Sequence, residues 1–226
     1  MKLTKQQIKK IKDYLTDRDI KYIDIHFEIL DHIITDIEFL IKHKGLTFEV
    51  ALEKVKLKWN NSFTKKSSFL LGLAYYAPSI LIDKCLKIYK PFFYKLLLML
   101  IAFIGFSYVL NDSFSYSLAN YKHKITVVIS IALSFYILFS IYGYIKMKLK
   151  KVNSSYRFIY DKQFFPSLFM AVIYHPFISV NYFTKENELS YIMLGMLILF
   201  FFTALGGRYL YKKHFEAISQ YKLNLN

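Results

Sequence analysis

Apolar and polar positions in the first part of the chain follow the period of α-helices. Ile8, Ile11 and Leu15 recur at helical spacing, and Thr4 and Gln7 before them fit a capping box. After a short break, a second apolar stripe advances in steps of four and three residues through Ile23, Phe27, Leu30, Ile34, Ile37 and Ile41. Each stripe predicts a helix with one buried face.

A third helix is expected after Gly45, which is placed to end the second helix in the left-handed conformation. Thr47 can cap the third helix, whose inward positions are Phe48, Ala51, Leu52, Val55 and Trp59. Three short helices over about 60 residues make a small domain with a thin core. We therefore expect a helical domain over 1–60 that leans on a partner or on the membrane.

The next segment, 61–91, is basic and contains the apolar run 67–82. This run has 16 residues and includes Pro78, whereas a helix needs about 20 residues to cross a bilayer core. Charged residues follow it at once, namely Asp83, Lys84, Lys87 and Lys90. We interpret the run as a helix or hairpin in the membrane interface, with a true span as the competing interpretation.

Longer apolar blocks in the rest of the chain predict about four transmembrane helices, which form a bundle over 92–211. The blocks cover about 92–110, 125–145, 164–183 and 190–207. The second block has no charge, and its large apolar side chains favour insertion by about 4–7 kcal/mol. The third block is weaker, since His175 and Pro176 interrupt it.

Composition supports a membrane protein over a soluble one. The residues AVILMFWYC make up 55% of the chain, and ten of the 16 acidic residues lie in the first 53 positions. The net charge of +15 therefore falls mainly on and between the apolar blocks. Contact with a lipid bilayer that has anionic headgroups explains this placement more simply than nucleic acid does.

Basic residues also predict an orientation. Six Lys or Arg lie in the linker 146–163 and four in the C-terminal part from 208, against three in the opposite loops. The positive-inside rule then places both termini, the linker and a tail over 212–226 in the cytosol. The first 20 residues lack the apolar stretch of a signal peptide, which agrees with this orientation. We expect a bacterial cytoplasmic membrane.

Residues 22–59 carry a recognisable pattern: an acidic helix with a histidine, a glycine, and a helix start of the form T-x-E-x-A. The positions are Glu28, Asp31, His32, Asp36, Gly45, Thr47, Glu49 and Ala51. The stretch resembles the HAAS-type, or permease-prefix, domain, which implies a regulatory or protein-contacting module ahead of transmembrane helices. The glycine-rich helix end of that family is replaced by Trp59-Asn60-Asn61. The whole layout resembles small uncharacterised membrane proteins of Bacteroidetes-type bacteria, which implies no particular activity.

The second predicted helix holds candidate site residues. Glu28, His32 and Asp36 are spaced four apart and share one face, with Asp31 beside them. Carboxylates and an imidazole so placed could bind a metal, but i,i+4 pairing on a solvated face explains them without one. We assign no metal or cofactor. A recognition surface for a basic partner is the functional alternative, and it makes these four the candidate partner-binding residues.

His175 is the candidate functional residue inside the membrane. An ionisable group there is a functional candidate because placing it in lipid costs free energy. The structural alternative is a neutral histidine bonded to a neighbouring helix, with Pro176 supplying a kink. Tyr136 and Tyr174 are its candidate partners. Ser130 and Ser134, and likewise Thr203 and Gly207, are small residues four apart that let helices approach closely.

The sequence contains no HExxH, phosphate-binding loop, GxSxG or CxxC motif, so we do not expect an enzyme. We expect a membrane-anchored interaction or regulatory protein whose cytosolic helical domain contacts a protein partner. The alternative is a small oligomeric channel or transporter with His175 in its path. A homo-oligomer is therefore left open, and a membrane enzyme remains a third class.

Overall fold

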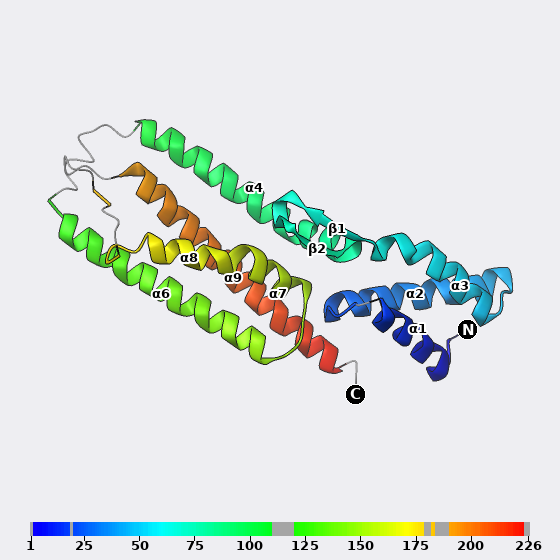
Figure 1. The fold of residues 1–226 in the computed structure, drawn as a ribbon. Coiled ribbons are helices and arrows are strands. Elements are labelled where there is room, and N and C mark those ends of the chain that lie inside the picture. The colour runs from blue at the N-terminus through cyan, green and yellow to red at the C-terminus, as the bar shows by residue number, and fades with distance from the viewer. Residues whose placement is uncertain (1, 19, 110–119, 179–181, 184–189, 224–226) are drawn as a thin grey trace. The chain divides into compact units, whose positions relative to one another are not determined.

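The computed structural model describes residues 2–18, 20–109, 120–178, 182–183 and 190–223 (Figure 1). It is mostly helical, at 81%, which confirms the expected helical class in its main part. The chain divides into two compact units. The first unit contains Met1–Lys87, Lys151–Phe158 and Lys213–Asn226, and the second contains Ile88–Lys150 and Ile159–Lys212. We describe each unit by itself.

The first unit begins with three helices, α1 (Lys5–Asp17), α2 (Ile23–Lys44) and α3 (Phe48–Trp59). The predicted capping box is present, because Gln7 N donates to Thr4 Oγ1 and Thr4 N donates to Gln7 Oε1. Gly45 ends α2 with a φ of 62° and donates its N–H to Ile41 O at 3.1 Å. Local sequence signals thus define the helix ends here.

The buried face of α2 differs from the predicted stripe. The buried residues are Ile25, Ile29, Leu30, Ile33 and Ile37, while Ile23, Phe27, Ile34 and Ile41 are only partly buried. The helix is apolar over more than half its circumference and packs against both α1 and α3, so the true core face is rotated from the expected one. The inward face of α3 is as predicted, with Phe48, Ala51, Leu52 and Val55 buried.

After a short 3-10 turn, η1 (Asn60–Phe63), the chain forms an antiparallel hairpin. It consists of β1 (Lys65–Ser68), the turn η2 (Phe69–Leu71) and β2 (Gly72–Pro78). Lys65 pairs with Pro78 and Ser68 with Gly72. Gly72 has a φ of 100°, a conformation that favours glycine. Of the two forms expected for this segment the hairpin is present, and no single helix over 67–82 forms.

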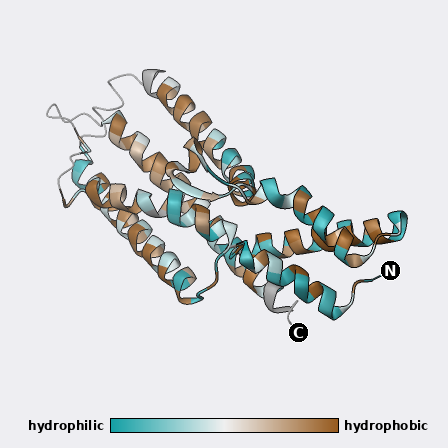
Figure 2. Cartoon of the chain, turned by 45° about the vertical axis from the view of Figure 1, so that its right-hand side comes forward, coloured by the Kyte–Doolittle hydropathy of each residue, from teal (hydrophilic) through white to brown (hydrophobic). Residues whose placement is uncertain are grey.

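Three helices are long and apolar enough to cross a membrane by length and composition. They belong to α4 (Ser79–Val109), α6 (Lys122–Leu149) and α9 (Tyr191–Leu223). Figure 2 shows the apolar colour along them. The helix predicted from residue 92 begins earlier, because α4 continues through Pro91 from Ser79. The first and third of these helices contribute residues to both units.

The segment predicted as the third span is not one long helix. The chain forms α7 (Ser155–Ile159), a π-helical turn η3 (Tyr160–Phe164) and α8 (Phe165–Ile173), and it leaves the helix at Tyr174. The expected position of His175 in the middle of a helix is therefore wrong, since it lies in the turn that follows α8. The loops expected on the far side of the membrane fall largely outside the described residues, and a count of four spans stays a prediction.

Helices α6, α8 and α9 of the second unit share a hydrophobic core. Its members include Leu133 and Tyr136 of α6, Ala171 of α8 and Phe200 of α9. Small residues allow close contact, because a Cβ added at Gly206 would overlap the ring of Phe164. Many large apolar side chains point outward instead of into this core, which suits a helix surface in lipid.

Candidate functional site

Three segments of the first unit meet around the carboxylate of Asp24, and a fourth joins them through Ser154. Asp24 Oδ1 accepts a hydrogen bond from Ser155 N at 2.9 Å, and Oδ2 accepts one from the Ser155 hydroxyl. Lys84 Nζ lies 3.4 Å from Asp24 Oδ2 and donates to Glu28 Oε2 at 2.6 Å. We call Asp24, Lys84, Ser154, Ser155 and His214 the polar junction.

Helix geometry explains why these groups meet. Asp24 lies in the first turn of α2, and Ser155 is the first residue of α7, whose early N–H groups have no partner inside the helix. The carboxylate therefore caps a helix that begins 131 residues further along the chain. The backbone reinforces the contact, because Ile23 N donates to Asn153 O at 3.0 Å.

A second hydrogen-bonded pair lies in the same junction. Ser154 Oγ accepts from Arg157 N at 3.2 Å, which caps α7 in the usual way, and lies 2.8 Å from His214 Nδ1. Ser154, Ser155 and His214 are all fully buried. His214 Nε2 has no hydrogen-bond partner among the described residues. The end of α9 is thus tied to the start of α7.

The charges in the junction are paired. The Asp24 side chain is only 10% exposed, and its oxygens receive donors from Ser155 and the ammonium of Lys84. A buried carboxylate is tolerated only when such partners surround it. Removing one partner leaves the other charge buried, so the arrangement holds its segments in one relative position.

Serine, histidine and aspartate occur together here, but they are not connected as a hydrolase requires. Asp24 bonds Ser155, whereas His214 bonds Ser154, so no serine has both a base and an orienting carboxylate in series. Both serines are buried away from any substrate. In the part of the chain that the structure describes, no three His, Cys, Asp or Glu side chains gather as a metal site needs.

A polar cavity of about 250 Å³ adjoins the junction. Its charged lining comes from Asp24, Lys84, Lys213 and Glu216, and Lys213 Nζ lies 2.7 Å from Glu216 Oε2. Because the lysines and carboxylates of this lining are paired with each other, the cavity does not present an excess of one charge to a ligand.

The predicted partner-binding residues are distributed over several contacts. Glu28 bonds Lys84, and Asp36 accepts from Lys58 Nζ at 2.7 Å and from Trp59 Nε1 at 3.4 Å. The ring of His32 stacks on Trp59, while the side chain of Asp31 is exposed. Three of the four therefore help to hold α3 and α4 against α2.

His175 in the second unit is buried and binds α6. Its Nε2 lies 3.1 Å from Ser134 Oγ and 3.2 Å from Ser130 O, and its Nδ1 accepts from Phe177 N at 3.3 Å. With Phe177 N donating to Nδ1, Nε2 is the ring nitrogen left to donate, and the carbonyl oxygen of Ser130 is its acceptor. Bonds to a neighbouring helix are what the structural alternative predicts, and a functional role of His175 stays a prediction.

The predicted tyrosine partners of His175 are wrong. The Tyr136 hydroxyl instead bonds Ser167 and lies 3.1 Å from Thr203 Oγ1, which links α6, α8 and α9. Tyr174 takes part through its carbonyl, which accepts from Tyr182 OH at 2.8 Å. Ser130 and Ser134 were expected to permit close packing, and they also supply the histidine's hydrogen-bond acceptors.

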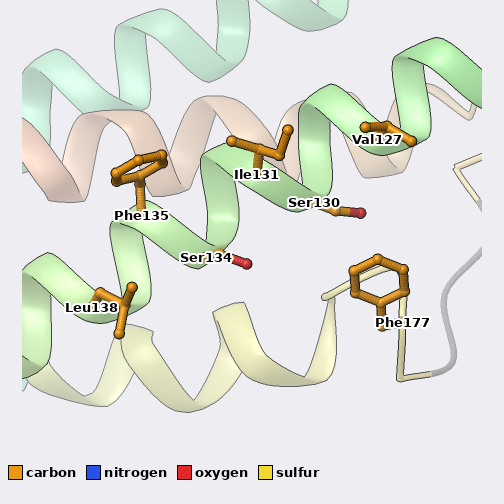
Figure 3. A pocket seen from close by; sticks show the side chains of 7 residues that line it. All are labelled: Val127, Ser130, Ile131, Ser134, Phe135, Leu138 and Phe177. Atoms are coloured by element: carbon orange, nitrogen blue, oxygen red, sulfur yellow. The ribbon is translucent and has the colours of Figure 1, made fainter.

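A cavity of about 210 Å³ lies beside the two serines (Figure 3). Its other lining residues are apolar, namely Val127, Ile131, Phe135, Leu138 and Phe177. Figure 3 shows the serine hydroxyls on the side of α6 that faces α8 and the turn after it. An ion path needs more polar groups than this, so the lining that the structure describes does not favour the channel alternative.

The polar junction was not predicted as a site. Ser154 and Ser155 carry a helix-capping signal that could have been found in the sequence, but nothing near them indicates Asp24 or His214. Comparison with protein-family models, curated proteins and solved structures finds no match. The resemblance of 22–59 to the HAAS-type domain therefore stays a prediction.

Proposed function

We propose that this chain is a membrane-anchored regulatory protein in which the polar junction couples a partner-binding helical domain to membrane-spanning helices. The observation that supports this most is the position of Asp24. It is part of α2, yet its bonds go to the start of α7 and to Lys84 in the second turn of α4. A displacement of α2 would therefore act directly on the start of α7 and on α4, which continues into a long apolar stretch.

The helices in question are suited to transmit such a displacement. Helix α4 has 31 residues and α9 has 33, and each includes a stretch apolar enough to cross a membrane. A helix rises about 1.5 Å per residue, so each of these two helices is long enough to reach from the first unit through its own apolar stretch. We place the junction and both termini on the cytosolic side of a bacterial cytoplasmic membrane, as the basic linker 146–163 favours.

The partner surface we propose is the outer face of α3. Val50 and Leu57 are seven residues apart, share a helix face, and are both exposed. Exposed apolar side chains grouped on a small helical domain are typical of a protein-binding surface. Asp31, exposed on α2, remains available for a basic group of the partner.

Site-specific photo-crosslinking in the native membrane tests the proposal. A photo-reactive residue at position 57 of the full chain should give a discrete crosslinked protein, which a Val50→Glu change should remove. The same residue at Lys44, which is exposed at the end of α2, is the matched control. Asp24→Asn should leave the crosslink at 57 in place, because it alters the coupling and not the surface. A crosslink pattern that is the same at 57 and 44 would contradict the proposal.

A further inference from the structure

The hairpin of the first unit exposes large apolar side chains at its turn and along β2. Phe69 is 82% exposed and Tyr76 is 70% exposed. Leu73, between them, is also exposed, whereas Leu71 and Ala77 are buried against the rest of the unit. The hairpin thus exposes three large apolar side chains, at its turn and on β2, which is unusual for a surface in water. We call these three side chains the apolar face.

The hairpin is fixed to the beginning of α4. Lys66 Nζ lies 2.6 Å from Asp83 Oδ1, and Ser79 N donates to Thr64 O at 2.8 Å. Strand β2 ends at Pro78 and α4 begins at the next residue. In Figure 1 both strands lie alongside the first turns of α4. The apolar face is therefore held beside the entry of a helix that is apolar enough to span a membrane.

The charge around this face is positive. Lys65 is exposed on β1, and the carboxylate of Asp83 is paired with Lys66. Exposed lysines beside aromatic side chains are the combination found at the headgroup level of anionic membranes, where each lysine gains attraction from the lipid charge. A protein groove would match the apolar residues, but it would not by itself explain the lysines.

We infer that the hairpin is a membrane-surface wedge: Phe69, Leu73 and Tyr76 insert into the headgroup region of an anionic bilayer, and Lys65 pairs with lipid phosphates. A phenylalanine at the turn and a tyrosine on the strand are side chains that favour this depth. The wedge is independent of the proposed protein partner, because its residues are separate from the outer face of α3.

The test uses the full chain in liposomes. Cys85 is the single cysteine and is buried, so wild type serves as the labelling blank. Phe69→Cys and, as matched control, Leu57→Cys on α3, which replaces a side chain that is 75% exposed, are each labelled with an environment-sensitive fluorophore. Vesicles contain phosphatidylcholine with or without phosphatidylglycerol, plus a lipid that carries a quenching nitroxide.

We expect the fluorescence emission of the label at 69 to shift to the blue and to be quenched by the nitroxide lipid, most strongly with phosphatidylglycerol. The emission of the label at 57 should stay that of a fluorophore in water. In the Phe69→Cys background, Lys65→Gln should lower the ratio of inserted to exposed label about fivefold in anionic vesicles.

Two results would overturn the inference. Equal quenching at 69 and 57 in both vesicles would show that the turn does not enter lipid, as expected if a protein covers it. Equal quenching at 69 in both lipids, unchanged by Lys65→Gln, would rule out selection of anionic headgroups.

Discussion

In the first unit, charged and hydroxyl groups join segments that are far apart in the sequence, whereas in the second unit aromatic rings and small residues do so. Asp24 and Ser155 belong to the first kind of contact, and Gly206 against Phe164 to the second. Water competes for polar groups at the surface of the first unit, so a buried cluster whose charges are paired is needed to fix its geometry.

The second unit follows the logic of helices in lipid. Lipid tails are as apolar as leucine, so apolar surface alone does not drive the helices together, and close packing with scattered hydrogen bonds does. The bonds of Tyr136 to Ser167 and Thr203 and the bonds of His175 to α6 are of this scattered kind. The two units should therefore respond differently to loss of a charge and to loss of a close contact.

The largest effect is expected from Asp24→Ala. This change leaves the N–H and the hydroxyl of Ser155 without their acceptor, and Lys84 keeps only the half-exposed carboxylate of Glu28. Breaking one partner of a buried pair costs about 3–5 kcal/mol. Trp59 is the only tryptophan and lies in the first unit, so its fluorescence during urea unfolding measures this unit.

Glu28→Gln is the matched control for that experiment. It removes the other carboxylate bonded to Lys84, but the Glu28 side chain is 55% exposed, so a loss below about 1 kcal/mol is expected. Equal losses for the two variants would show that the burial of Asp24 does not matter.

Gly206→Ala tests the packing of the second unit. The new Cβ would overlap the Phe164 ring, and overpacking of this kind costs about 1–3 kcal/mol. Gly105→Ala in α4 is the control, because a Cβ there meets nothing within 4 Å, and alanine favours a helix over glycine by about 1 kcal/mol. Thermal unfolding in detergent should show opposite signs. A destabilised Gly105→Ala would argue against the packing described for the second unit.

His175→Ala is expected to have a moderate effect. Hydrogen bonds between helices in membrane proteins contribute about 0.6 kcal/mol on average and up to about 1.7. Faster hydrogen exchange at the Phe177 amide, which donates to His175 Nδ1, would identify the lost contact. Ser134→Ala, which removes one of the two acceptors on α6, should give a smaller change. Ion flux in liposomes that disappears with His175→Ala would instead support the channel alternative.

Sequence alone predicted features that depend on neighbouring residues. The capping box at Thr4 and the helix end at Gly45 each need only four or five residues, so they were correct. The face of α2 was predicted wrongly because isoleucines occupy more than one side of the helix, and the choice depends on where α1 and α3 pack.

Contacts between distant segments could not be predicted. Nothing around Asp24 indicates that its partner begins a helix at Ser155, and the π-helical turn before α8 has no signal in the apolar pattern. Bonds from His175 to a neighbouring helix were among the alternatives, but its partners were misjudged, since small serines on α6 bring the helices closer than tyrosines would.

The smallest expected effect is on the pH dependence of stability, and it concerns His26 on α2. It should make the stability of the first unit depend on pH in mild acid. Burial lowers the pKa of His26 below its ordinary value of 6.5, so the folded state holds it neutral while the unfolded state accepts a proton. Stability contributed by this residue is present above pH 6.5 and is lost as the pH falls through that value toward the lowered pKa. Unfolding followed by Trp59 should therefore become easier in mild acid, and His26→Gln should reduce the slope of stability against pH. An unchanged slope in the variant would assign the acid sensitivity to other groups and remove this contrast between the units.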